Sequence, residues 1–124
     1  MIDSNIIIDH LCGIKEATIF MMKNFGECCI SPITYAEVLA GCIDEHIIHV
    51  KSYLEAFHFI TLDTKDASIA AEIRKLHKIK LPDAFQAALS QNRNLFLVTR
   101  NTKDFSSKKF PFVLVPYQVV SEKA

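Results

Sequence analysis

Apolar residues recur along the chain in two patterns that alternate from one end to the other. Segments with apolar side chains at the spacing of one helix face are residues 6–11, 15–25, 32–42, 47–54, 63 or 64 to 76, and 82–91. Short segments that are mostly apolar, as in strands covered on both faces, are residues 27–30, 57–62, 95–99 and 112–115. A further strand ends at Asp3. Because helices separate the strands, this order predicts an α/β domain with a mostly parallel central sheet flanked by helices.

Two of these predicted helices carry additional signals. Ser31 followed by Pro32 places a hydrogen-bonding cap before a proline in the first turn, which is typical of a helix start. In the helix that begins at residue 63 or 64, Ile69, Ile73 and Leu76 are spaced by four and three. We therefore expect these three side chains to line one face of the helix.

Composition indicates one packed domain, residues 1–124, because half of the 124 residues are hydrophobic and nine are Phe. No window approaches the roughly 18 uninterrupted apolar residues of a membrane span. No basic stretch precedes an apolar core at the N-terminus, so we expect no signal peptide. Four cysteines without export indicate reduced thiols and a cytoplasmic location. Since the formal net charge is zero, any affinity for nucleic acid must come from local basic patches.

Four acidic residues stand at separate points of the chain: Asp3, Glu37, Asp83 and Asp104. In open parallel sheets, functional groups collect beyond the carboxyl ends of the strands. Asp3 ends one strand, and Asn101 and Asp104 follow the strand at residues 95–99, while Glu37 and Asp83 lie on helices whose starts can face the same edge. Crowded carboxylates repel unless a hard cation lies between them, and Mg²⁺ or Mn²⁺ prefers such oxygens and activates water. The pattern therefore predicts a metal-dependent phosphodiesterase.

Each acid also has an interpretation without catalysis. Asp83 lies in the first turn of its helix, where a carboxylate is stabilised by about 0.3–1 kcal/mol. Glu37 could be an exposed helix residue, and Asp104 could form a turn before Phe105. Asp3 is harder to explain in this way, because a carboxylate directly after a buried strand is costly unless it is paired or bound to metal.

Four segments carry a family resemblance: IDSNIIID at 2–9, SPITYAEV at 31–38, KLPDA at 80–84 with Ala87 and Ala88, and LVTRNTKDF at 97–105. In order and spacing they resemble the motifs of the PIN domain, the ribonuclease fold of VapC-type toxins in bacterial toxin–antitoxin pairs. The similarity spans nearly the whole chain. It implies a PIN-like three-layer sandwich and a metal-dependent endoribonuclease.

The resemblance also implies roles for the acids. It makes Asp3, Glu37 and Asp83 metal ligands, and either Asn101 or Asp104 the last ligand position. The family commonly has an acid where this chain has Asn101, so Asp104 could supply the missing charge. Only Met1 and Ile2 precede Asp3, where the family usually has several apolar residues; either the first strand is short or the native chain starts upstream. One or two Mg²⁺ or Mn²⁺ ions would activate water for in-line attack, with Glu37 orienting water or a hydrated metal, and leave 5′-phosphate and 3′-hydroxyl ends.

Polar and basic residues beside these motifs are candidates for supporting roles. We expect Ser4, Asn5 and Thr99 to hold the carboxylates by hydrogen bonds. Candidate contacts to RNA phosphates are Arg74, Lys75, Lys78, Lys80, Arg100 and Lys103. The alternative for these basic residues is a solvated helix face.

Other functions compete with a nuclease. A catalytically weak PIN-like binding module is possible, because Asn101 replaces an acid. Cys42, His46 and His49 would lie on one helix face and could bind zinc, but no fourth ligand is near, so a half-buried helix face is favoured. A regulator with a phosphate-accepting Asp fits poorly, because the acids are dispersed.

The implied partners are an RNA substrate, an antitoxin whose tail crosses the acidic cleft, and a second copy of the chain. The helices between residues 34 and 57 carry more apolar side chains than a lone pair needs, namely Tyr35, Ile47, Ile48 and Tyr53 in addition to a core-facing set. We therefore expect a homodimer and an antitoxin groove on these helices.

Overall fold

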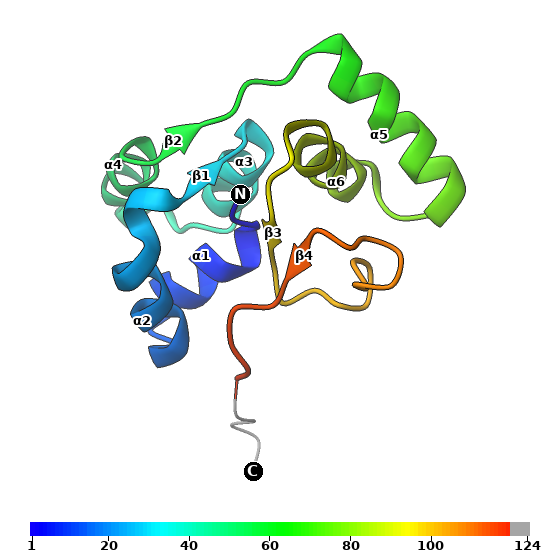
Figure 1. The fold of residues 1–124 in the computed structure, drawn as a ribbon. Coiled ribbons are helices and arrows are strands. Elements are labelled where there is room, and N and C mark those ends of the chain that lie inside the picture. Colours follow the sequence, from blue (N-terminus) through cyan, green and yellow to red (C-terminus); the bar gives the residue numbers. More distant parts are fainter. Residues whose placement is uncertain (120–124) are drawn as a thin grey trace.

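The computed structural model describes residues 1–119, in which helices and strands alternate as predicted (Figure 1). The helices are α1 (Ser4–Leu11), α2 (Lys15–Asn24), α3 (Pro32–Ala40), α4 (Ile47–Glu55), α5 (Thr64–His77) and α6 (Leu81–Arg93), with 3₁₀ turns η1 (Phe25–Glu27) and η2 (Asp44–His46). The strands are β1 (Cys29–Ile30), β2 (His58–Phe59), β3 (Leu97–Val98) and β4 (Val113–Leu114). Each strand is shorter than the apolar segment that predicted it. Within residues 1–119, no helix has the length and apolar content needed to cross a membrane.

The N-terminal segment joins two strand pairs into one small sheet. β1 pairs with β2 and β3 pairs with β4, both in parallel. Ile2 donates a backbone hydrogen bond to Cys29 and forms a parallel bridge with Val98. Val98 N donates to Met1 O at 2.8 Å, and Asp3 N donates to Val98 O at 2.9 Å. The order is therefore β2, β1, the N-terminal segment, β3 and β4, with Asp3 at the end of the central segment.

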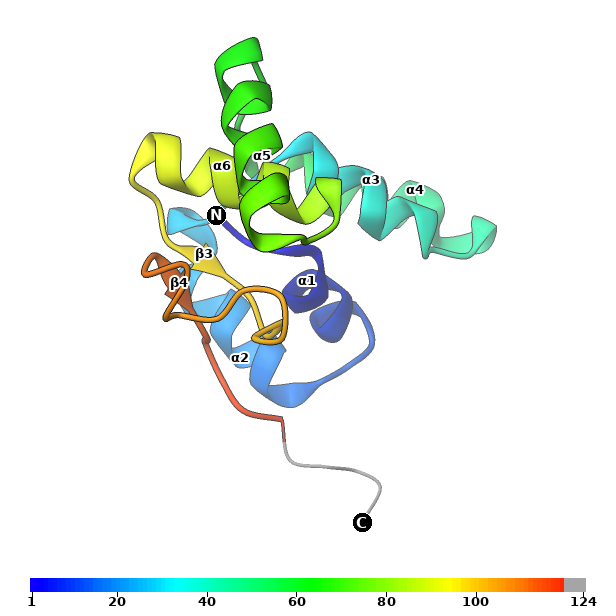
Figure 2. The same cartoon turned by 90° about the vertical axis from the view of Figure 1, so that its right-hand side faces the viewer.

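Neighbouring residues of the central segments face opposite sides of the sheet, as the pleat of a strand requires. Met1 and Leu97 belong to the hydrophobic core under α5 and α6, whereas Ile2 and Val98 belong to the core under α1 to α4. Figure 2 shows α5 and α6 on one side of β3 and β4, with α1 and α2 on the other. The prediction of helices flanking a parallel sheet in three layers is confirmed.

Helix α3 begins where its sequence signals predict. Ser31 is the N-cap, its Oγ accepts a hydrogen bond from Thr34 N at 3.3 Å, and Pro32 is the first helical residue. The proline needs no backbone donor at this position, so the first turn carries no penalty. This start places Glu37 on the second turn of α3.

The buried face of α5 differs from the prediction at one end. Asp66, Ala70 and Ile73 are buried, and the ring of His77 lies 4.6 Å from that of Phe110, so the inward positions are spaced by four, three and four. Leu76 lies beside this face and is 75% exposed. Of the three residues predicted to line one face, Ile73 is buried and Ile69 partly buried, whereas Leu76 lies at the exposed edge of that face.

An ion pair between the buried Asp66 and the partly exposed Arg93 joins α5 to α6. Arg93 Nη1 donates to Asp66 Oδ1 at 2.7 Å and Nη2 to Oδ2 at 3.0 Å, and Asn92 Nδ2 donates to Asp66 Oδ1 at 3.0 Å. The hydrogen bonds from Arg93 hold the pKa of the Asp66 carboxyl well below its usual range. Because Asp66 is fully buried, its charge depends on these partners.

Candidate active site

Asp3 lies between the sheet and the first helix, with its carboxylate fixed from both sides. It is the N-cap of α1, and Oδ1 accepts from Ser4 N at 2.8 Å. Oδ2 accepts from Thr99 Oγ1 at 2.7 Å. Asp3 is only 4% exposed, and a buried carboxylate is stable only when such donors replace water. The orientation of Asp3 is therefore set by the fold itself.

Glu37 faces Asp3 from α3 and is linked to it through Ser4. Ser4 Oγ donates to Glu37 Oε1 at 2.9 Å. Burial is the largest cause that raises the pKa of Glu37; in decreasing order, the bond from Ser4 lowers it, the charge of Asp3 raises it and the charge of Lys80 lowers it. Glu37 is thus partly buried and electrostatically coupled to Asp3, in contrast to the alternative of a fully exposed helix residue.

Asp83 is affected by the charges of the other three acids. Burial is the largest cause that raises its pKa from 3.8 to about 6, followed by the charges of Asp3, Asp104 and Glu37. Lys80 acts in the opposite direction. A like charge raises the pKa of a carboxyl only when it lies within electrostatic range of that carboxyl. Asp3, Glu37 and Asp104 thus all act electrostatically on Asp83, on the side of the molecule where the sequence placed them.

Asn101 and Asp104 form one unit after β3. Asn101 Nδ2 donates to Asp104 Oδ2 at 3.1 Å, and Asp104 N donates to Asn101 Oδ1 at 3.2 Å. The next residue, Phe105, is fully buried and anchors the turn. Asn101 thus orients the Asp104 carboxylate, and the negative charge near Asp83 at this position comes from Asp104.

Thr99 connects the acids to the polar residues that follow Asp3. Its hydroxyl donates to Asp3 and accepts from Asn5 Nδ2 at 3.1 Å and from Asn101 N at 3.0 Å. Asn5 Oδ1 also accepts from Arg100 N at 3.3 Å. Ser4 and Thr99 thus bind carboxylates as expected, whereas Asn5 reaches Asp3 only through the Thr99 hydroxyl. Their importance for activity stays a prediction.

Gln86 is a site residue that the sequence analysis missed. It is fully buried on α6, and its Nε2 donates to Thr34 Oγ1 at 2.8 Å and to Asp3 Oδ1 at 3.4 Å. Its Oε1 accepts from Ser31 Oγ at 2.6 Å. The available signal was a long polar side chain within the apolar sequence AFQAAL, since a polar group in such a place must find partners.

Arg100, one of the predicted RNA contacts, pairs instead with Asp9 of α1. Its Nε and Nη2 donate to the two Asp9 oxygens at 2.6 and 2.9 Å. Tyr117 OH donates to Asp9 Oδ2 at 2.8 Å, and the guanidinium lies 6.0 Å from the centre of the Tyr117 ring. Arg100 therefore links α1 to the segment after β3, and its charge is neutralised within the protein.

The other predicted phosphate contacts differ in their hydrogen bonds and exposure. Arg74 Nη1 donates to Ile79 O at 2.6 Å, at the end of α5. The remaining lysines are exposed: Lys75, Lys78, Lys80 and Lys103. Lys80 is the one whose charge lowers the pKa of both Glu37 and Asp83, so it lies at the rim of the acidic site.

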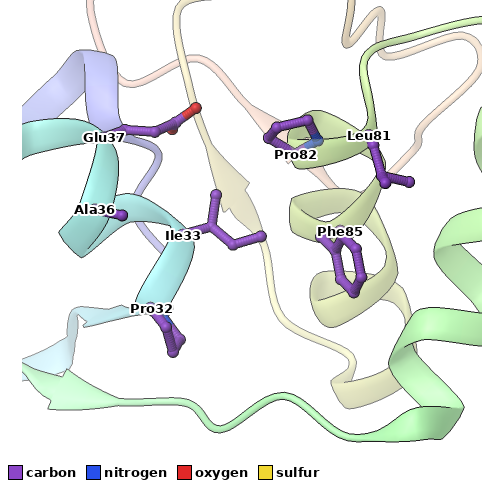
Figure 3. Close-up of a pocket in the computed structure, with 7 residues that line it drawn as sticks. All are labelled: Pro32, Ile33, Ala36, Glu37, Leu81, Pro82 and Phe85. Atoms are coloured by element: carbon purple, nitrogen blue, oxygen red, sulfur yellow. The ribbon is translucent and has the colours of Figure 1, made fainter. Parts of the chain in front are cut away.

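An apolar hollow of about 410 Å³ adjoins the acids between α3 and α6. Its lining consists of Pro32, Ile33, Ala36, Leu81, Pro82 and Phe85, with Glu37 at one end. Figure 3 shows Ile33 of α3 and Pro82 of α6 facing each other across this hollow, and the Glu37 carboxylate extending from α3 toward α6. A substrate held at the acids would therefore have an apolar surface beside it.

A second groove, of about 460 Å³, lies where α1, α3 and α4 meet. Cys42, His46 and His49 contribute to its wall, together with apolar residues such as Leu11 and Ile43. Within residues 1–119, no three His, Cys, Asp or Glu side chains are arranged as a ready metal site, which applies to this wall and to the four acids alike. Zinc ligation gains no support here. The interpretation of one half-buried helix face was also wrong, because Cys42 lies in the link after α3, His46 in η2 and His49 in α4, and both histidines are exposed.

The apolar side chains predicted to be exposed on α3 and α4 are mostly packed. Ile48 is 76% exposed, whereas Tyr35, Ile47 and Tyr53 are partly buried. The Tyr53 ring packs edge-on against Phe57 at 5.3 Å. The unpartnered apolar surface on these helices is therefore smaller than predicted.

Residues 1–111 match the PIN domain family, and the chain belongs to that family of nucleases, as its motifs predicted. The chain is similar to a toxin–antitoxin complex from Klebsiella pneumoniae, with a TM-score of 0.81 and 34% identity over 95% of this chain and 98% of that one. The chain is also similar to FitAcB from Neisseria gonorrhoeae, with a TM-score of 0.77 and 23% identity over 95% of this chain and 98% of that one. VapBC2 from Rickettsia felis, in a structure with a DNA fragment from its promoter, has a TM-score of 0.74 and 21% identity over 92% of this chain and 94% of that one. The last two likenesses concern the fold; none of the curated proteins matches the chain.

Proposed function

We propose that the protein is a divalent-metal-dependent endoribonuclease and the toxin of a toxin–antitoxin pair. The supporting observation is the meeting of Asp3, Glu37, Asp83 and Asp104 at the carboxyl edge of a parallel sheet. Four carboxylates from four segments repel one another, and a hard cation would relieve that repulsion. Membership of a nuclease family supports the same reading.

The donor set fits Mg²⁺ or Mn²⁺, because every candidate ligand atom is an oxygen and the pKa of Asp83 is raised by burial and by its acidic neighbours. We assign Asp3, Asp83 and Asp104 to hold the ion, with Asn101 orienting Asp104. Such an ion, when bound, acidifies water and stabilises charge on phosphate oxygens.

The remaining groups of the site have tasks of their own in this proposal. Glu37, which is held by Ser4 and partly open to solvent, would accept a hydrogen bond from the attacking water. Lys80 at the rim attracts the substrate phosphates, which four acids alone would repel. Ser4 and Thr99 keep the carboxylates in place.

We propose the groove between α1, α3 and α4 as the docking place of the antitoxin. It is lined largely by apolar side chains, and the similar structure from Klebsiella pneumoniae is a toxin–antitoxin complex. An apolar helix of the antitoxin would bury Leu11 and Ile43, which are 43% and 57% exposed. A homodimer remains part of the proposal, with Ile48 as its most exposed apolar residue on α4.

The test is cleavage of end-labelled RNA by the purified protein in Mg²⁺, in Mn²⁺ and in EDTA, with single-stranded DNA of the same sequence as a control. Cleavage of RNA only with metal, leaving 5′-phosphate and 3′-hydroxyl ends, supports the proposal. RNA binding without cleavage in any metal would instead favour the weak binding module.

The partner is tested separately. The product of a small reading frame adjacent to the gene, co-expressed with this chain, should co-purify and inhibit cleavage. Light scattering should give the mass of two copies for the isolated chain. Substituting Ile43 by Asp should abolish co-purification while leaving the RNA cleavage of the isolated chain intact. Co-purification that is indifferent to this change would remove the groove from the proposal.

A further inference from the structure

Three polar side chains form a fully buried cluster between α3 and α6. Gln86 accepts from Ser31 at 2.6 Å and donates to Thr34 at 2.8 Å, and all three residues have no exposed surface. Gln86 uses both ends of its amide in this way. The cluster therefore fixes the separation and the rotation of the two helices against each other.

The cluster lies one helical turn from two of the acids. Glu37 follows Thr34 by three residues on α3, and Asp83 precedes Gln86 by three residues on α6. Residues three apart lie on the same face of a helix. Any sliding or rotation of α6 against α3 at the cluster would therefore displace Asp83 relative to Glu37.

The same cluster reaches the third acid. Gln86 Nε2 is 3.4 Å from Asp3 Oδ1, and Thr34 Oγ1 donates to Ile2 O at 3.1 Å, in the backbone directly before Asp3. The elements that carry Asp3, Glu37 and Asp83 are thus joined at one buried point.

Stability alone gives little reason for an amide at this position. A leucine would fill similar space in the Ala- and Leu-rich interior of α6 without the desolvation cost of a buried polar group. Ser90, one turn further along the same helix, shows the contrast: its buried hydroxyl has no hydrogen-bond partner within the described chain. The partners of Gln86 lead to the acids, whereas Ser90 has none.

We propose that Gln86 is a positioning residue, which sets the spacing of Asp3, Glu37 and Asp83 for binding the cation and cleaving RNA. This inference rests on the nuclease function proposed above. Gln86 touches neither RNA nor metal in this role, and it acts through Thr34, Ser31 and Asp3.

The experiment compares Gln86→Leu with Ser90→Ala as a matched buried control on the same helix. Mn²⁺ affinity is measured by isothermal titration, and kcat and KM by RNA cleavage. Gln86→Leu should weaken Mn²⁺ binding and lower kcat by about 10–100-fold, as loss of a group that orients ligands does. KM for RNA should change little, because the exposed lysines are untouched. Ser90→Ala should change none of these quantities.

Thr34→Val provides a second variant of similar shape. It should lower Mn²⁺ affinity in the same direction, and the double variant with Gln86→Leu should lose less than the product of the single effects, because both changes break one network. If Gln86→Leu does not fold, Thr34→Val decides the question alone.

Unchanged Mn²⁺ affinity and kcat in the folded variants, with only the unfolding temperature lowered, would overturn the proposal and make Gln86 a core amide. If the parent protein neither binds Mn²⁺ nor cleaves RNA, the nuclease function itself fails and the inference falls with it. The two failures are distinct, because the first leaves the parent active.

Discussion

The ionised carboxylate of Asp83 should weaken the metal-free protein, and replacing it by Asn tests this directly. Burial and three neighbouring acids raise its pKa from 3.8 to about 6. A difference of about 2 between the folded and unfolded pKa corresponds to about 3 kcal/mol, which we reduce to about 1–2 kcal/mol because Asp83 is only partly buried. The substitution also removes a negative charge that stabilises the start of α6, and this loss offsets about 0.3–1 kcal/mol of the gain in stability. Asp83→Asn should therefore be as stable as the parent at pH 8, or up to about 1.5 kcal/mol more stable.

The pH dependence follows from the sign of the shift. Between pH 3.8 and about 6 the folded chain binds more protons at Asp83 than the unfolded chain does, so stability falls as the pH rises. The favourable contribution of protonated Asp83 is complete below pH 3.8 and lost as the pH rises through about 6. Asp66, whose pKa is lowered, has the opposite dependence in both proteins and cancels from their difference.

The assay is thermal unfolding in EDTA from about pH 4 to pH 8. The control variant is Asp44→Asn, which makes the same substitution at an exposed position. The Asp83 variant should gain up to roughly 5 °C over the parent at the alkaline end and nothing at the acid end. Mg²⁺ should then stabilise the parent by RT ln(1 + [L]/Kd) and the variant far less. A variant that melts well below the parent at every pH would show that Asp83 serves first as a helix-start carboxylate.

Three further changes test other parts of the site and fold. Asp104→Asn should reduce Mn²⁺ affinity and RNA cleavage severely and Asn101→Ala mildly, because Asn101 contributes only a neutral amide that orients its neighbour; the reverse order would make Asp104 a turn residue. Arg93→Met should cost about 2–4 kcal/mol in urea unfolding, since it leaves Asp66 buried without its partner; a cost below that of a surface substitution would contradict the buried pair. Lys80→Ala should weaken RNA binding and reduce the salt slope by about 1, measured by fluorescence anisotropy; an unchanged slope would remove this phosphate contact.

Local signals in the sequence carried much of the fold. The alternation of helical and strand-like segments predicted the parallel sheet, and Ser31 with Pro32 predicted the start of α3. The meeting of the acids could also be predicted, because Asp3 and Asp104 follow strands that end at one edge of the sheet. These residues all lie at the ends of helices or strands, and local sequence patterns predict such ends well.

Other features depend on contacts between distant segments and left little trace in the sequence. A glutamine on a helix is exposed by default, and the partners of Gln86 in Ser31 and Thr34 lie 55 and 52 residues away. Arg100 was predicted as a phosphate contact because its partner Asp9 lies 91 residues away in the sequence. Strand lengths were overestimated because buried residues beside a strand are apolar even where they make no ladder hydrogen bonds.

The long reach of the Asp3 contacts has a consequence for synthesis on the ribosome. Its partners Gln86 and Thr99 follow it by 83 and 96 residues. Chains grow at about 5–20 residues per second, so Asp3 is made roughly 5–20 seconds before Thr99 exists. We therefore expect a nascent chain to contain no assembled acidic site until β3 has emerged, so that any RNA cleavage would begin only after Thr99 has been made. RNA cleavage by a ribosome-stalled chain that ends before Leu97 would contradict this order of events.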